Sequence, residues 1–395
     1  MNTFKYLFQL QSTRKIKVIL ISTVTPGPNS AGQLVLQRHL MNEPAIDLHV
    51  LQTEPIRQGF RKFIRRFLGR LGQSRLLHRF CQDIMALWRG GWIDAELPVP
   101  DDIGIPTVVM TVAHEEACYA AMRYAQRYQL PLVTIFHDWW PDIPKVHQPF
   151  RPMLERSFRR LYRESSLALC VSPGMKKALG PHSNAKVLLP VPAEAGSSTE
   201  LSAGEIRLPF RLLYSGNLGE YGSMLMEALN TFKGHANIRL EVRGPNPAWP
   251  ESFKEEMSAR GLLLPFAPRK EFNSWIKKAE AFLITQSFEE KHSRLMQTNF
   301  PSKLVEFAQF GKPLILWAPS NASGPKWAIE SGQGMVVDDK NPEQLRQALE
   351  ILCEDTAEQE RLSAAAKDAA AACFDPKRIQ SNFMDWLHEI AIKSP

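Results

Sequence analysis

The chain has 395 residues, of which 44% are hydrophobic and 23% charged, values that are ordinary for a globular protein and exclude global disorder. This length predicts about two to three domains. The formal net charge of +7 arises in one segment, because residues 57–79 carry eight bases and no acid while the remainder is nearly neutral. The 5 cysteines are scattered, which predicts buried reduced thiols. No run approaches the roughly 18 apolar residues of a membrane span, so we predict none.

The first part of the chain alternates apolar strands with helices. We predict strands at residues 17–22, 47–51, 106–112, 131–136 and 167–171, with a helix at 115–128. These strands are continuous apolar runs, which is typical of a parallel sheet covered on both faces. The basic segment, residues 57–80, interrupts this alternation and also has the apolar spacing of an amphipathic helix.

A stretch rich in Pro, Ser, Gly and Ala, residues 191–209, predicts a linker, after which the alternation restarts. Further strands are predicted at 211–215, 238–242, 262–266, 281–285 and 313–317, and the last helices at 342–352, 357–373 and 376–392. We therefore expect an N-terminal domain over 1–190, a second domain over 210–375, and a C-terminal helix in 376–395 that packs back towards the first domain. Ligands bind outside the carboxyl ends of parallel strands, so two such domains predict a central cleft.

Residues 299–315 (NFPSKLVEFAQFGKPLI) combine a helix start, one carboxylate and a Gly-Lys-Pro stop ahead of a buried strand. Pro301 or Ser302 begins the helix, whose free N–H groups attract a phosphate, and Lys303 adds a cation. Glu306 lies one turn further on, where its carboxylate can accept hydrogen bonds from two ribose hydroxyls. The alternative is a plain helix capped by Ser302, with Glu306 in solvent.

This stretch resembles the nucleotide-sugar site of GT-B glycosyltransferases, particularly the retaining family 4. In that family two acids separated by seven residues precede Gly-Lys-Pro, and Glu306 matches the second, which holds the ribose. Thr298 stands in place of the first, as in a branch of bacterial polysaccharide transferases that is similar to residues 301–307. Weaker similarities occur in the family's order at residues 25–33, 135–138, 170–174 and 213–218.

The resemblance implies an α/β architecture, with two Rossmann-like domains whose parallel sheets face a central cleft. It also implies a glycine loop near the donor phosphates and the acceptor, formed by Gly27, Ser30 and Gly32. Gly216 and Asn217 would form the first turn of the donor-binding domain.

Many relatives carry an Arg and a Lys after this turn, but residues 219–222 contain no cation. We therefore expect Lys303 and Arg294 to bind the diphosphate. Arg243 is more simply explained as a salt-bridged surface residue.

His137 ends a predicted strand and begins an aromatic loop, His137-Asp138-Trp139-Trp140-Pro141. In the family resembled, a histidine at this strand end contacts the donor sugar, and indole faces stack well on sugar rings. Asp138 can act as a base in an inverting enzyme or can orient His137. The alternative for His137 is a structural or merely exposed residue, and His114 is a weaker candidate.

The chemistry implied is displacement of a nucleoside diphosphate from the anomeric carbon of a sugar by an acceptor hydroxyl. Lys303 and a helix N-terminus can stabilise the leaving group, and no Asp-x-Asp motif occurs, so we expect neither metal nor cofactor. The resemblance implies a nucleotide-sugar donor, a saccharide or lipid-linked saccharide of bacterial surface polysaccharide synthesis as the acceptor, and retention of configuration. Alternatives are a sugar-nucleotide epimerase on the same scaffold, or a non-catalytic membrane or nucleic-acid binder, although no nucleic-acid module is recognisable.

Residues 60–71 predict an interfacial helix. At about 100° per residue, apolar side chains including Phe60, Phe63 and Phe67 share one face, and basic residues share the other: Arg61, Lys62, Arg65, Arg66 and Arg70. Each cation near an anionic lipid surface contributes about 1 kcal/mol. We expect a cytoplasmic protein that docks on the inner face of the cell membrane. The alternative is a helix packed on the first domain with a solvated basic face.

Overall fold

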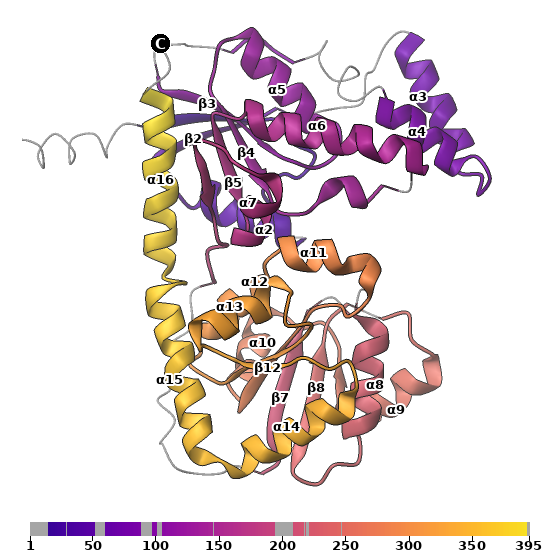
Figure 1. The fold of residues 1–395 in the computed structure, drawn as a ribbon, viewed down its shortest axis with the longest axis vertical. Coiled ribbons are helices and arrows are strands. Elements are labelled where there is room, and N and C mark those ends of the chain that lie inside the picture. The colour runs from indigo at the N-terminus through magenta and orange to yellow at the C-terminus, as the bar shows by residue number, and fades with distance from the viewer. Residues whose placement is uncertain are drawn as a thin grey trace, which may run out of the picture. The chain divides into compact units, whose positions relative to one another are not determined.

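The computed structural model describes residues 15–28, 30–51, 60–87, 97–100, 105–144, 146–193, 208–216, 218, 221–245 and 247–392. The chain divides into two compact units (Figure 1): unit 1 comprises Met1–Leu188 and Ile379–Pro395, and unit 2 comprises Leu189–Arg378. Each unit holds a six-stranded parallel sheet with helices packed on it. Within the described part of the chain, no helix has the length and apolar content needed to cross a bilayer.

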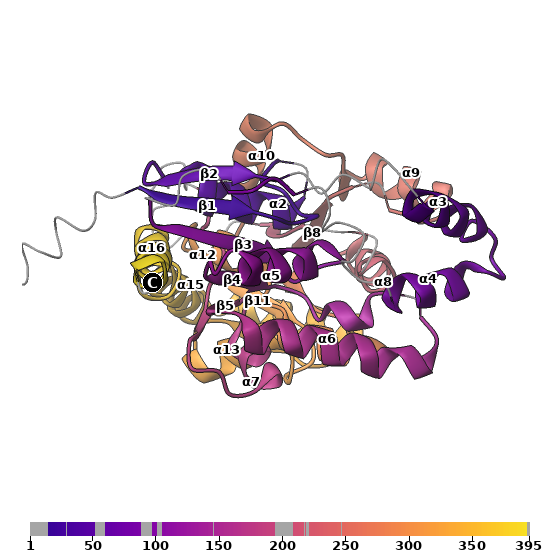
Figure 2. The ribbon, with the colours of Figure 1, turned by 90° about the horizontal axis from the view of Figure 1, so that it is seen from above.

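The sheet of unit 1 has the strand order β2-β1-β3-β4-β5-β6. Its strands are β1 (Ile16–Leu20), β2 (Ile46–Val50), β3 (Thr107–Val112), β4 (Leu132–Phe136), β5 (Leu167–Cys170) and β6 (Ala185–Val187). Its helices are α2 (Ala31–Leu36), a π-helix (Gln37–Met41), α3 (Phe60–Leu71), α4 (His78–Leu87), α5 (Ala117–Arg127), α6 (Arg151–Glu164) and α7 (Pro173–Leu179), with 3-10 turns at Trp140–Asp142 and Gln148–Phe150. Figure 2 shows α5 and α6 side by side along this sheet.

The sheet of unit 2 has the order β12-β11-β10-β7-β8-β9. Its strands are β7 (Phe210–Ser215), β8 (Ile238–Arg243), β9 (Leu263–Leu264), β10 (Ala281–Thr285), β11 (Leu314–Trp317) and β12 (Met335–Val337). Its helices are α8 (Gly222–Phe232), α9 (Glu251–Ala259), α10 (Arg269–Ile276), α11 (Ser293–Thr298), α12 (Ser302–Ala308), α13 (Ser323–Ser331), α14 (Pro342–Glu354) and α15 (Thr356–Ala372), with a 3-10 turn at Glu290–His292.

The last helix, α16 (Pro376–Ile392), packs on unit 1 from residue 379 onward. The Oε1 atom of Gln380 lies 3.0 Å from Nδ1 of His39, and the ring of Phe383 lies 4.9 Å from the His39 ring. Both His39 and Phe383 are fully buried. The helix is therefore held to the π-helix of unit 1 by polar and aromatic contacts.

The inner strands are buried along their whole length and are mainly apolar, as the sequence predicts. Every residue of β1, β3, β4, β5, β10 and β11 is buried. The 5 cysteines are free, and all except Cys373 are buried. Burial raises the pKa of Cys170 and of Cys353 to about 12, which keeps both thiols protonated and unreactive.

The strand order of each sheet reverses at one point, and loops that follow neighbouring strands diverge there. In unit 1 the reversal lies between β1 and β3, and in unit 2 it lies between β7 and β10. Carboxyl ends of parallel strands at such a point form the crevice in which open α/β sheets bind ligands. The segments after these strands, and after the neighbouring β4, are therefore where site residues are to be sought.

Candidate functional site

In unit 1, three neighbouring strands bring polar groups together at their carboxyl ends. Nε2 of His137, directly after β4, lies 3.0 Å from Oδ2 of Asp138. The ring of His114, two residues after β3, is stacked on the His137 ring with centroids 6.2 Å apart. Thr23, which follows β1, donates from Oγ1 to the carbonyl oxygen of His114 at 3.5 Å. The structure therefore groups His137 with Asp138 and adds His114, the weaker sequence candidate.

The electrostatics of this cluster assign different roles to its members. Burial raises the pKa of Asp138, but the hydrogen bond from His137 and the charges of His137 and His114 more than offset it, so its pKa lies below the ordinary value. A carboxylate with a lowered pKa is a weak base, which favours the orienting role for Asp138. Burial lowers the pKa of His114, against the opposing charges of Glu115 and Asp138, so this imidazole is neutral at pH 7.

The aromatic loop does not offer its indoles to a ligand. Trp139 is 1% exposed and Trp140 is 7% exposed, and both belong to the core of unit 1. Trp139 donates from Nε1 to Oε2 of Glu155 at 2.9 Å, and the Arg159 guanidinium lies over its ring. The expectation that these tryptophans stack on sugar rings is therefore wrong. They anchor the segment after His137 to α6 instead.

The glycine loop of unit 1 leads into α2. Ser30 is the N-cap of this helix, and its hydroxyl accepts from the Gln33 N–H at 3.3 Å. A Cβ atom at Gly27 or Gly32 would meet other atoms only at ordinary contact distances of 3.6 Å or more. Packing within the described part of unit 1 therefore requires neither glycine, and a ligand role for this loop stays a prediction.

In unit 2, α12 carries the predicted donor site. Its first residue is Ser302, its N-cap is Pro301, and no side chain caps it, so the alternative of a helix capped by Ser302 is wrong. Nζ of Lys303 lies 2.6 Å from Oε2 of Glu306, and the side chains are 34% and 21% exposed. Lys303 also lies over the rings of Phe272 and Phe307, at 5.8 and 5.7 Å. The cation and the carboxylate are thus held side by side in the first two turns.

The end of α11 is fixed by Gln286, a residue that sequence reasoning missed. This side chain follows β10, is 1% exposed, and donates from Nε2 to Met296 O at 3.0 Å and to Asn299 Oδ1 at 2.9 Å. Its Oε1 accepts from the Gly324 N–H at 3.0 Å, at the start of α13. A Cβ at Gly324 would lie 2.8 Å from this oxygen and 3.2 Å from Pro301 Cγ, so any larger residue there would displace the amide. One amide therefore ties the end of β10 to the end of α11 and the beginning of α13.

Three further residues that the sequence analysis weighed at the donor site have different surroundings. Arg294 is exposed on α11. Thr298, in place of the acid of the family pattern, is 2% exposed and donates to Arg294 O at 2.8 Å, so it faces its own helix. Arg243 is salt-bridged to Glu271 at 3.1 Å, as expected, but it is buried rather than on the surface.

The predicted turn after β7 is described only in part. Gly216 follows β7 directly, whereas Asn217 lies outside the described residues. A Cβ at Gly244, after β8, would lie only 2.2 Å from the Gly216 carbonyl oxygen. The two loops therefore touch through their backbones, which explains why glycine occupies position 244.

Two family models match the chain, one in each unit. Residues 102–187 match the model described as Glycosyltransferase Family 4, and residues 209–369 match the one described as Glycosyl transferases group 1. The chain is a glycosyltransferase of the GT-B fold. The comparison with curated proteins finds no match.

Solved structures similar to this glycosyltransferase span almost all of it. Anabaena Alr3699/HepE in complex with UDP and glucose is 15% identical, with a TM-score of 0.58, over 95% of this chain and 100% of that one. Sucrose-phosphate synthase from Thermosynechococcus elongatus is 12% identical, with a TM-score of 0.60, over 96% and 100%. A glycosyltransferase from Rickettsia africae is 14% identical, with a TM-score of 0.61, over 97% and 100%. At these identities the likeness establishes the shared fold.

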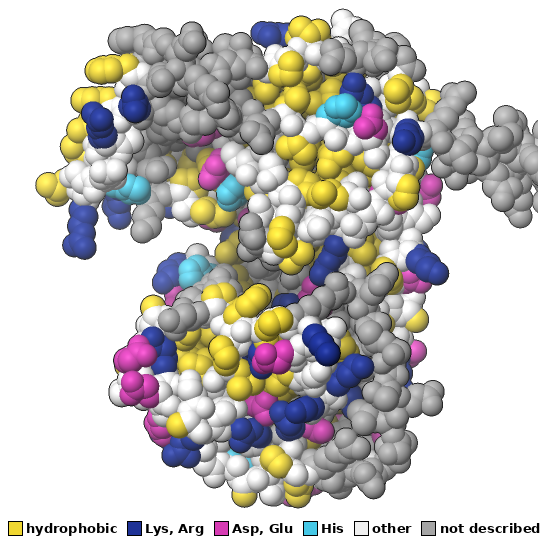
Figure 3. All heavy atoms as spheres, turned by 180° about the vertical axis from the view of Figure 1, so that it is seen from behind, with side chains coloured by type: hydrophobic (Ala, Val, Ile, Leu, Met, Phe, Trp, Pro, Cys, Tyr) yellow, Lys and Arg dark blue, Asp and Glu magenta, His cyan; other side chains and the backbone are white. Residues whose placement is uncertain are grey.

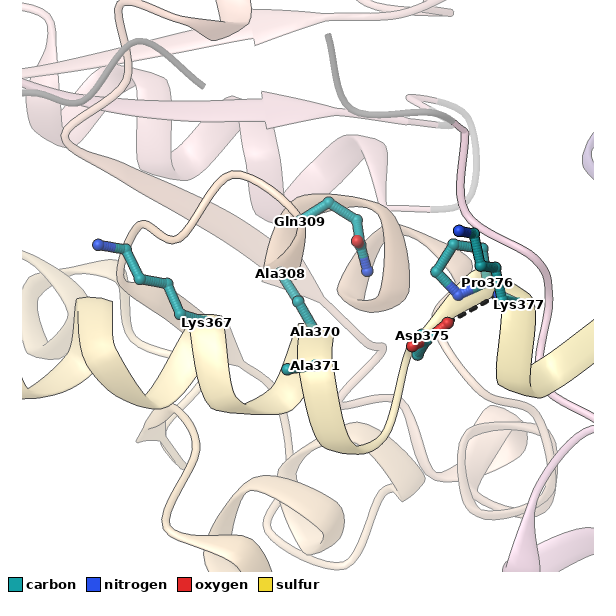
Figure 4. A pocket seen from close by; sticks show the side chains of 8 residues that line it. All are labelled: Ala308, Gln309, Lys367, Ala370, Ala371, Asp375, Pro376 and Lys377. Atoms are coloured by element: carbon teal, nitrogen blue, oxygen red, sulfur yellow. Dashed lines mark hydrogen bonds between the residues drawn. The ribbon is translucent and has the colours of Figure 1, made fainter. Parts of the chain in front are cut away.

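The glycosyltransferase also has a pocket of about 420 Å³ at the C-terminal end of α12. Its lining comes from α12, α15 and the start of α16 (Figure 4): Ala308, Gln309, Lys367, Ala370, Ala371, Asp375, Pro376 and Lys377. The two lysines lie at opposite ends of it, and Asp375 Oδ1 accepts from the Lys377 N–H. These polar groups do not converge, so we do not place the donor there.

Proposed function

We propose that this glycosyltransferase moves a sugar from a nucleoside-diphosphate sugar to a hydroxyl of a saccharide or lipid-linked acceptor in bacterial cell-surface polysaccharide synthesis. The observation that carries the donor class is the Lys303–Glu306 pair at an uncapped helix start beside the carboxyl end of β10. Similar structures are described as complexes with UDP, UDP-glucose and UDP-2-fluoro glucose, which makes UDP the first nucleotide to test.

The roles proposed for unit 2 follow from charge. The N–H groups at Ser302 and the ammonium of Lys303 bind the diphosphate, aided by Arg294, and Glu306 accepts from the ribose hydroxyls. The bond between the anomeric carbon and the phosphate oxygen breaks, and the nucleoside diphosphate keeps the electron pair. The acceptor oxygen bonds to that carbon, and its proton passes to the departing phosphate or to water. These donors stabilise the developing charge without a metal.

The roles proposed for unit 1 concern the sugar and the acceptor. His137 binds a sugar hydroxyl through Nδ1, and Asp138 holds the ring through its 3.0 Å contact with Nε2. No protein nucleophile is proposed, and retention of configuration is proposed from the resemblance to family 4. Gly27, Ser30 and Gly32 border the acceptor.

Lipid docking by α3 and α4 would bring this enzyme to a lipid-linked acceptor. Phe63 is 65% exposed, Phe67 is 52% exposed, and their rings stack at 6.3 Å. The side chains of Phe60, Arg61, Lys62 and Arg65 lie outside the described ones, although their backbone is part of α3. Leu68 on the same helix is buried, so the hairpin packs by Leu68 and leaves the phenylalanines outside.

The exposed apolar surface continues past α3 into the turn and α4. Leu76 is 91% exposed, Leu77 39% and Phe80 53%, and exposed bases accompany them: Arg66, Arg70, Arg75 and Arg79. Figure 3 shows hydrophobic and basic side chains interleaved on this projecting part of unit 1. Apolar groups that enter a headgroup layer beside cations that pair with anionic lipid support docking on the cytoplasmic face of a cell membrane.

The docking proposal is tested by co-sedimentation with vesicles. Wild type should sediment with phosphatidylglycerol vesicles and not with phosphatidylcholine vesicles. A quadruple variant should no longer sediment with phosphatidylglycerol when glutamine replaces Arg61, Lys62, Arg65 and Arg66. A Lys277→Gln/Lys278→Gln variant, which removes two exposed cations of unit 2, is the matched control. If the quadruple variant sedimented with these vesicles as wild type does, the docking proposal would be wrong.

The catalytic proposal is tested by a thermal-shift panel of UDP, GDP, ADP, TDP and CMP on wild type and Glu306→Ala. A ligand of the folded state raises the melting temperature by mass action. One diphosphate that shifts wild type alone would support the donor site. Turnover of the matching nucleotide sugar without acceptor would favour an epimerase, and no shift with any nucleotide would refute the donor proposal.

A further inference from the structure

The donor diphosphate needs cations that the segment after β7 does not supply. That segment, residues 216–222, contains no Lys, Arg or His. Arg243, at the end of the neighbouring β8, donates to Pro265 O and Glu271, each at 3.1 Å, and its guanidinium lies 5.0 Å from the Trp275 ring. It is thus committed to packing beside β9. Lys303 shares its charge with Glu306.

The segment after β10 carries three basic residues, and His292 is the least exposed of them. Lys291 is 71% exposed and paired with Glu289, and Arg294 is exposed. His292 is only 30% exposed, and its Nδ1 lies 3.1 Å from Oγ of Ser287. Ser287 is 5% exposed and stands two residues past β10. The imidazole of His292 is therefore fixed over the carboxyl end of β10.

This place is the point where the strand order of unit 2 reverses. The Ser287 N–H donates to Sδ of Met296 at 3.1 Å, and the Tyr221 hydroxyl, from the segment after β7, lies 3.9 Å from the same sulfur. The His292 loop is thus joined to the segments that follow both β7 and β10. Ligands of open α/β sheets bind at this reversal.

The hydrogen bonds also determine which ring nitrogen of His292 can donate to a ligand. Oγ of Ser287 accepts from the Glu289 N–H at 3.1 Å, so its own proton is available to Nδ1 of His292. A neutral ring in that arrangement carries its proton on Nε2, and a protonated ring carries one there as well. In either state Nε2–H can donate to a phosphate oxygen.

We propose that His292 binds the donor diphosphate through Nε2, in place of the cations that many relatives carry after the first turn of this domain. This inference rests on the proposed function, because it presumes a nucleoside-diphosphate donor in unit 2. It adds a ligand residue that the family pattern of acids and Gly-Lys-Pro does not contain.

The test compares UDP with uridine by calorimetry on wild type, His292→Ala and Lys291→Ala, with GDP and guanosine used if UDP gives no heat. His292→Ala removes a hydrogen bond to a charged phosphate, so it should weaken UDP binding about tenfold or more. Binding of uridine should not change, because uridine has no phosphate. Lys291→Ala, which removes the neighbouring exposed cation, should leave both affinities unchanged.

Three results would overturn the assignment. If His292→Ala binds UDP as tightly as wild type, His292 does not contact the diphosphate, and the proposed function still stands. An equal loss for uridine and UDP shows that the imidazole only supports the loop, and the melting temperature of the free variant would fall with it. If wild type binds neither diphosphate, the proposed donor class fails and this inference fails with it.

Discussion

Replacing Glu306 with Ala should separate a small loss of stability from a large loss of nucleotide affinity. The Lys303–Glu306 pair is close, at 2.6 Å, but both side chains are partly exposed and lie three residues apart on one helix. Such pairs contribute about 0.2–0.5 kcal/mol. For a unit of this size we therefore expect a fall in melting temperature of about 2 °C or less.

The loss of affinity should be much larger. Two ribose hydroxyls that donate to one carboxylate are worth about 1.5–3 kcal/mol each. Losing both hydrogen bonds should raise the dissociation constant for UDP about 100-fold or more. The assay is calorimetric titration with UDP and with 2′,3′-dideoxy-UDP, in which wild type should prefer UDP by this factor and Glu306→Ala should show no preference.

A matched control is available on α13 of the same unit. Lys326 and Glu330 form an exposed pair with the atoms 4.0 Å apart. Glu330→Ala should leave both stability and the preference for UDP unchanged. If Glu306→Ala kept the preference of wild type, Glu306 would not be the ribose ligand, whatever its total affinity.

Three further outcomes follow from the described contacts. The pKa of Asp138 is lowered in the folded state, so its contribution to stability is complete above the ordinary value of 3.8 and is lost as pH falls below it. Between pH 5 and pH 3, the free energy of unfolding measured by urea titration should therefore fall less for Asp138→Asn than for wild type. Gln286→Leu removes three hydrogen bonds and leaves two buried partners, Met296 O and the Gly324 N–H, unsatisfied at about 1–3 kcal/mol each. The free energy of unfolding should therefore drop by at least about 2 kcal/mol, and a drop under half of that would contradict the role of Gln286. Gly244→Ala places a Cβ 2.2 Å from a carbonyl oxygen, so it should lower the free energy of unfolding by about 1–3 kcal/mol in chemical denaturation. The control is Gly234→Ala, because a Cβ at Gly234 would have no atom within 4 Å. Equal losses in the two variants would refute the close approach at Gly244.

Much of the element order was predictable because it depends on local patterns. The continuous apolar runs that predicted strands at 131–136 and 281–285 are β4 and β10, and the helix predicted at 376–392 is α16. The edge strands β6 and β12 were missed, because three-residue strands carry too short a pattern to stand out from a loop. The Lys303–Glu306 pair, which we propose as part of the donor site, was equally visible because both residues lie within one helix.

The sequence by itself determined the two α/β halves, the basic segment and the residues of α12, because periodicity, composition and short motifs are local. Only the tertiary structure decided that Trp139 is core rather than ligand surface, that Gln286 joins three segments, and that His292 stands over β10. The sequence alone does not show whether a tryptophan or a glutamine is buried or exposed. Its role depends on partners contributed by distant segments, which are brought together only when the parallel strands align.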